Sequence, residues 1–221
     1  MSEKTVLPSL ARVVRGLVLL FWGVPAMLLA ATACALDLGW RQFGFAPTAV
    51  ASASLVVGLF HLRKFQARET VWVNARHRAS FLALLLVGLS PTPVWWNRAP
   101  DEAFFGHGMV LLSLAGVAFL IAVNDAILRL AAMLPDQALR SETLFFTRLN
   151  SRGLMVLGLF VLLWLGLPHW NPAPEPIVRF RAFLEFTRPW LFIMLLLPPV
   201  ALTMTLLWKI KEAILHSVFR G

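Results

Sequence analysis

Four histidines lie close to the ends of long apolar stretches, where they could bind a haem. His61 and His77 lie near one end of these stretches, and His107 and His169 lie near the other. Imidazoles from different helices, paired at two depths, are what a membrane cytochrome with two haems requires. His107 and His169 are therefore a candidate haem pair. The competing interpretation, which we prefer, is that they are ordinary polar residues at helix ends, so no cofactor is predicted.

The remaining polar residues form no recognisable catalytic set. Asp125 lies four residues before Arg129, so the two can pair on one face of a helix. Ser90 and Ser113 lack the flanking pattern of a nucleophile elbow. No phosphate-binding glycine loop and no His-Glu-x-x-His metal motif occurs. We therefore predict that the protein is not an enzyme.

The composition is that of a membrane protein. The mean hydropathy is +0.75 and 14% of the residues are charged, whereas about a quarter are charged in a soluble domain. A helix needs about 20 mainly apolar residues to cross a bilayer and satisfies its own backbone there. We predict an all-α polytopic integral membrane protein with a single transmembrane domain over residues 1–221. The six predicted spans are 16–35, 45–62, 79–96, 104–126, 153–170 and 190–208.

The basic residues predict the orientation of these spans. With a cytoplasmic N-terminus, 15 of the 20 Lys and Arg residues fall on the cytoplasmic side. This asymmetry follows the positive-inside rule, so we expect both termini in the cytoplasm of a bacterium with the chain in its inner membrane. The basic face should attract anionic lipids. Nucleic acid is not an expected partner, because the charges line a bilayer surface without a platform for stacking bases.

One pattern occurs twice between the apolar stretches. The segment RETVWVNARHR (68–78) resembles RSETLFFTRLNSR (140–152), and an offset of 74 matches Arg78 to Arg152 and Trp96 to Trp170. A looser match near residue 15 extends the repeat, so we predict three tandem helical hairpins. Arg and Trp are typical anchors at the two membrane boundaries. The predicted membrane-interface and partner-docking residues are Arg68, Arg76, Arg78, Arg140, Arg148, Arg152, Trp96 and Trp170.

Smaller features predict how the helices pack and end. Ser54 and Gly58, like Ala118 and Ala122, are small residues four apart, a spacing that lets helices approach closely in lipid. The second, fourth and sixth spans are expected to continue beyond the membrane as basic amphipathic helices. Residues 177–188 are predicted to lie along the outer interface as a short amphipathic helix. Prolines inside the spans should kink or end them.

These observations favour a non-catalytic subunit that scaffolds or anchors a larger assembly of membrane proteins. This hypothesis rests on the apolar interior, on the Arg and Trp anchors at the membrane boundaries, and on connections too short to hold a separate domain. A small-solute transporter, or a substrate-binding subunit of one, is the first alternative and predicts a polar or aromatic cavity at mid-depth. An electron-transfer subunit that binds haem or quinone is the second.

Overall fold

The computed structural model describes residues 3–36, 38–39, 41–65, 69–99, 102–133, 137–166 and 175–219. All regular structure in these ranges is helical, which confirms the predicted all-α class. The helices are α1 (Glu3–Ala35), α2 (Ala46–His61), α3 (Thr70–Gly88), α4 (Thr92–Arg98), α5 (Ala103–Ala132), α6 (Gln137–Gly166) and α7 (Glu175–Phe219). Two 3-10 turns, η1 (Arg41–Phe43) and η2 (Leu62–Lys64), lie between them.

Within the described residues, four helical segments are long and apolar enough to cross a membrane. They are Leu10–Ala35, Thr70–Arg98, Ala103–Ala132 and Leu139–Leu163. The first three contain the predicted spans 16–35, 79–96 and 104–126, and the fourth overlaps the predicted span 153–170 but begins earlier. The helix at the predicted span 45–62, α2, is apolar and has 16 residues.

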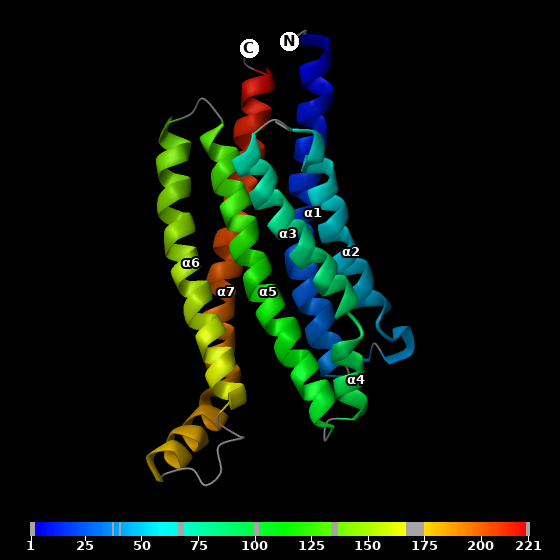
Figure 1. Ribbon diagram of the computed structural model, residues 1–221, viewed down its shortest axis with the longest axis vertical. Helices are drawn as coiled ribbons and strands as arrows, with labels where there is room; N and C mark the ends of the chain where they lie inside the picture. Colours follow the sequence, from blue (N-terminus) through cyan, green and yellow to red (C-terminus); the bar gives the residue numbers. More distant parts are fainter. Residues whose placement is uncertain are drawn as a thin grey trace.

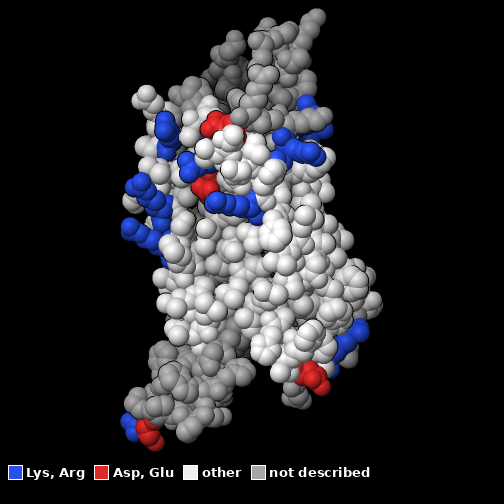
Figure 2. All heavy atoms as spheres, viewed as in Figure 1, with Lys and Arg blue, Asp and Glu red and all other residues white. Residues whose placement is uncertain are grey.

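The long helices form one bundle (Figure 1). α2 packs on α1, α3 on α2, α5 on α3, α6 on α5 and α7 on α6, and α7 also packs on α1, so the helices close into a ring. Figure 1 shows both chain ends at one end of the bundle, which we call the N/C end. In Figure 2, Lys and Arg gather toward this end, above a broad uncharged surface.

A break separates α3 from α4 inside the third predicted span. Pro91 cannot donate a backbone hydrogen bond, and the chain turns there. Pro93 likewise has no N–H to donate to Leu89, whose carbonyl accepts hydrogen bonds from the backbone and the hydroxyl of Thr92 instead, at 3.0 and 2.7 Å. The buried hydroxyl of Thr48 on α2 donates to the carbonyl of Ser90 at 2.8 Å. The neighbouring helix therefore satisfies backbone groups that the break exposes.

The predicted helical extensions are only partly right. α2 ends at His61 in a 3-10 turn, and α5 ends at Ala132, so neither continues as a long basic helix. The charged segments belong to the helices that follow, because α3 begins at Thr70 and α6 at Gln137. Pro135 lies between α5 and α6 and cannot continue a helix in the ordinary way. After the predicted span 190–208 the chain does continue as helix, since α7 reaches Phe219.

Residues 177–188 are helical, as predicted, but the helix is much longer than the short one expected. This segment is the first part of α7, which continues through the predicted span 190–208. Figure 1 shows the first part of α7 at an angle to the remainder. Pro189 lies in this region, and a proline that removes a backbone hydrogen bond is a common cause of such bends.

The contact between α1 and α2 depends on glycine. A Cβ atom placed on Gly16 of α1 would lie 2.7 Å from the carbonyl oxygen of Gly58 on α2. A Cβ atom on Gly23 would lie equally close to the hydroxyl oxygen of Ser54, at 2.7 Å. The predicted close approach at Ser54 and Gly58 is thus confirmed, and we call this contact the α1–α2 seam.

α7 is held to three other helices. Its Trp208 ring lies 5.5 Å from the ring of Phe21 on α1, measured between centroids. The Lys209 ammonium forms an ion pair with Glu142 of α6. Thr203 of α7 hydrogen bonds to Asn124 of α5. These contacts close the ring of helices around a core of mainly Leu, Ala and Val side chains.

Candidate functional site

A groove lies over α5, between α3 and α6, in the half of the bundle nearer the N/C end. Its volume is about 1010 Å³. α5 packs against both flanking helices, which leave its outer face open between them. The lining residues are Ala75, Arg78, Phe81, Leu82, Ala118, Ile121, Ala122, Asp125, Leu128, Arg129, Thr147, Arg148, Ser151, Arg152 and Met155. We call this feature the arginine groove.

The charge of the arginine groove is strongly positive. Four arginines and one aspartate line it. Asp125 and Arg129 form an ion pair at 3.6 Å, as their spacing predicted. Within the described part of the chain, Arg78, Arg148 and Arg152 make no ion pair or hydrogen bond. Three guanidinium groups are therefore available to an anion at this surface.

The repeated sequence pattern brings two of these arginines together. Arg78 on α3 and Arg152 on α6 are matched by the offset of 74, and they line the two sides of the same groove. The sequence predicted both as residues of the membrane boundary. Their convergence over α5 could not be read from the repeat, because it depends on α3 and α6 flanking the same helix.

A second polar feature is buried at the junction of α5, α6 and α7. The hydroxyl oxygen of Thr203 accepts hydrogen bonds from the amide groups of Asn124 and Asn150, at 3.0 and 2.9 Å. Asn150 also donates to the carbonyl of Pro199 at 3.0 Å, and Asn124 to that of Leu120 at 2.8 Å. Each of the three side chains is at most 1% exposed. We call this set the Asn–Thr–Asn cluster.

The Asn–Thr–Asn cluster is suited to holding helices together. Hydrogen bonds between polar side chains are a recognised cause of helix association in lipid. The carbonyl of Pro199 accepts from Asn150 and from Thr203, so the cluster also satisfies backbone in the proline-containing part of α7. The sequence drew attention to Asp125, which is next to Asn124, but gave no indication of Asn150 or Thr203. Their signal was weak, because Asn150 lies in the charged segment and a single Thr in a span is common.

Arg76 lies inside the bundle and not at its surface. It is 6% exposed and shares the buried face of α3 with Trp72, Ala75 and Ala79. Its Nε group has no hydrogen-bond partner among the described residues. The other predicted docking residues are placed differently: Arg140 is exposed on α6, and Trp96 is half-buried on α4. Arg68 and Trp170 lie outside the described residues.

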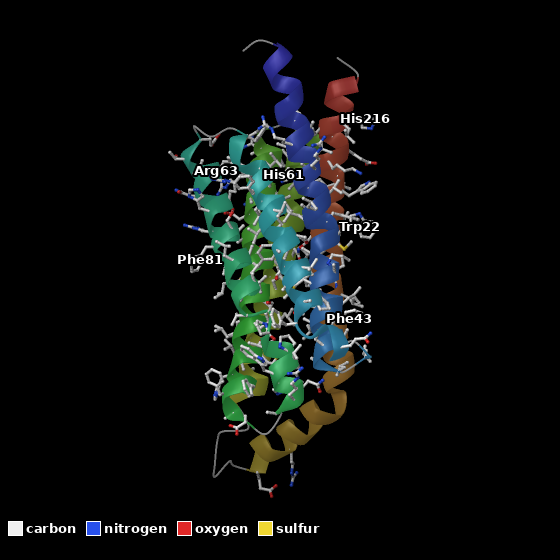
Figure 3. The ribbon with its side chains drawn as sticks, turned by 90° about the vertical axis from the view of Figure 1, so that its right-hand side faces the viewer. Trp22, Phe43, His61, Arg63, Phe81 and His216 are labelled. Atoms are coloured by element: carbon white, nitrogen blue, oxygen red, sulfur yellow. The ribbon has the colours of Figure 1, made fainter. Side chains whose placement is uncertain are left out.

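The histidines occupy both ends of the bundle. His107 is exposed near the start of α5, and His169 lies outside the described residues, so the candidate haem pair stays a prediction. His61, near the N/C end in Figure 3, has its Nδ1 atom 2.8 Å from the carbonyl oxygen of Val57 in the preceding turn. His77 is exposed on α3. No group of three or more His, Cys, Asp or Glu side chains within the described ranges could hold a metal ion.

Comparison with protein families, curated proteins and solved structures finds no match to this chain.

Proposed function

We propose that this chain crosses a bacterial inner membrane six times, as three hairpins with both termini in the cytoplasm. The position of both chain ends at the N/C end supports an even number of crossings. The concentration of Lys and Arg toward that end supports its cytoplasmic location. With a rise of about 1.5 Å per residue, α2 is about 24 Å long, which suits a slightly short span in a core of about 30 Å.

We further propose that the protein is a non-catalytic scaffold or anchor subunit of a membrane complex. The observation that carries this proposal is the use of buried polar side chains as links between helices. The Asn–Thr–Asn cluster joins α5, α6 and α7, and Thr48 joins α2 to the break after α3. Such links should resist relative movement of the helices, which suits an anchoring subunit.

Contacts with a partner would involve the outer faces of the bundle. Large apolar side chains are exposed there on several helices, including Trp22 on α1 and Phe81 on α3. Figure 3 shows these two side chains pointing away from the bundle on opposite sides. A scaffold should place a protein against one such face and leave another to lipid, so the faces can be distinguished experimentally.

A photo-crosslinking amino acid, placed in turn on four helices, tests the scaffold proposal in intact membranes. Suitable exposed positions are Trp22, Phe60, Leu84 and Val156. We expect discrete protein adducts from one or two adjacent positions and only lipid adducts from the others, with each variant compared at equal expression. Protein adducts from none of the four positions would exclude a scaffold that uses these faces.

Small-solute transport is the second candidate, and one observation favours it. The Asn150 carbonyl oxygen is buried without a hydrogen-bond partner, close to the prolines of α7. Transporter binding sites use polar groups that lack a partner in the protein to hold the substrate, and Asn150 would place such a group between Arg148 and Arg152, nearer the N/C end than mid-depth. An Asn150→Cys variant in a Cys34→Ser background distinguishes the two functions. A scaffold predicts no reaction with a membrane-impermeant thiol reagent from either side, whereas a transporter predicts reaction from at least one.

A further inference from the structure

We propose that the arginine groove is a specific binding site for one anionic phospholipid, with the phosphate among the arginines and an acyl chain along the apolar part of the groove. The proposal deepens the proposed function in one respect, since it rests on this chain lying in a membrane with the N/C end at the lipid headgroups. It does not depend on a protein partner.

The lining of the groove changes character along the helices. Nearer the N/C end, Arg78, Arg129, Arg148, Arg152 and the hydroxyl-bearing Ser151 provide hydrogen-bond donors. Further toward the opposite end, the lining is Phe81, Leu82, Ala118, Ile121, Ala122 and Met155. Ala118 precedes Arg129 by eleven residues on α5, which corresponds to about 16 Å along the helix axis. The groove is therefore long enough for a headgroup and the upper part of an acyl chain.

The charges select an anion. Three of the four arginines are unpaired within the described ranges, and the single aspartate is paired with the fourth. Guanidinium groups bind phosphate through two parallel hydrogen bonds, which favours arginine over lysine at such sites. Basic pockets between transmembrane helices on the cytoplasmic side are known to hold acidic lipid headgroups. The charge and the depth of this groove agree with that chemistry.

The apolar continuation selects a lipid over a free anion. A phosphate ion would use the arginines alone and leave the surface of Phe81, Ile121 and Met155 without a function. Ala118 and Ala122 keep the floor of the groove low, because a methyl group is the smallest side chain that a helix can present after glycine. An acyl chain laid over them would cover this surface at the same depth as the surrounding lipid tails.

Native mass spectrometry of the full-length protein tests the proposal, with lipid titrated in detergent. We expect phosphatidylglycerol to bind about tenfold more tightly than phosphatidylcholine. The double variant Arg78→Gln/Arg152→Gln should weaken phosphatidylglycerol binding about thirtyfold, because two cationic contacts with the headgroup are lost. The matched control, Arg15→Gln/Arg140→Gln, removes the same charge from exposed positions outside the groove and should bind lipid like the natural chain.

A second variant keeps every arginine. Ala122→Leu raises the floor of the groove and should displace the acyl chain, so that phosphatidylglycerol binds more weakly while inorganic phosphate is unaffected. Equal phosphatidylglycerol binding by the natural chain and the Arg78→Gln/Arg152→Gln variant would overturn the proposal, as would equal losses in the Arg15→Gln/Arg140→Gln control. Complete displacement of lipid by excess inorganic phosphate would show a phosphate site only.

The same groove can be probed in membranes. A photo-crosslinking residue at Phe81 should yield lipid adducts, and a protein adduct at this position would assign the groove to a partner and overturn the lipid site. The outcome is separable from that of the scaffold experiment. Lipid binding with no protein adduct at Trp22, Phe60, Leu84 or Val156 would keep the lipid site and reject the scaffold.

Discussion

The α1–α2 seam and the arginine groove show opposite uses of small residues spaced four apart. At the seam, Ser54 and Gly58 of α2 lie against α1, so that a Cβ atom on Gly23 or Gly16 would be 2.7 Å from the Ser54 hydroxyl oxygen or the Gly58 carbonyl oxygen, respectively. In the groove, Ala118 and Ala122 have the same spacing but lie on an open face of α5. Small side chains thus permit close packing, and the positions of the neighbouring helices decide whether it occurs.

The largest expected effect is that of Gly16→Leu at the seam. A leucine side chain cannot fit against the backbone of α2, so the helices must separate or the side chain must distort them. We expect a loss of about 3 kcal/mol in the free energy of unfolding. Thermal or denaturant unfolding of the purified protein in detergent measures it. An unchanged stability would mean that the seam is not closed in the folded protein.

Thr203→Val tests whether the Asn–Thr–Asn cluster, which contains no glycine, depends on a single residue as the α1–α2 seam does. The substitution keeps the shape of the side chain but removes the hydroxyl that links Asn124 and Asn150. Two buried amide groups would lose a partner, which should lower the free energy of unfolding by about 1–2 kcal/mol. The same unfolding measurement applies, with Thr205→Val as the control, since Thr205 is exposed on the same helix and bonds only within it.

Glu142→Gln tests an ion pair that is more exposed than the α1–α2 seam and less exposed than the arginine groove. The ion pair between Glu142 and Lys209 joins α6 to α7, and both side chains remain more than a third exposed. A half-exposed pair contributes little, so we expect a loss of at most about 0.5–1 kcal/mol. The loss should shrink as salt is added, because added ions screen this interaction. A loss independent of salt would point to packing of the side chains and not to their charge.

The smallest expected effect on stability is that of Ala122→Leu in lipid-free detergent. The added side chain should extend into the open groove that Ala122 lines, so the free energy of unfolding should stay within about 0.5 kcal/mol of the original. The difference between the losses of stability caused by Ala122→Leu and by Gly16→Leu tests directly whether the groove is open and the α1–α2 seam is closed. Similar losses from the two substitutions would show that the groove is closed by packing and is not a surface.

Much of the fold was predictable because lipid and water impose simple rules. The all-α class and the positions of α1 and α5 followed from apolar length and from the backbone's need for internal hydrogen bonds. Helix ends were predicted less well. Charged segments 68–78 and 140–152 were assigned to a boundary, whereas α3 and α6 include most of them. Charge alone does not end a helix, because Arg and Glu are good helix formers.

The candidate sites were predictable only in their parts. The sequence identified Arg78, Arg148 and Arg152 and indicated that they lie near one membrane boundary. Only the tertiary structure brought them together over α5, and only it distinguished the buried Arg76 from its exposed neighbours. Composition and periodicity predict whether a segment forms a helix and whether that helix prefers lipid or water. A groove or a hydrogen-bonded cluster depends instead on which helices become neighbours, and this is decided by tertiary packing.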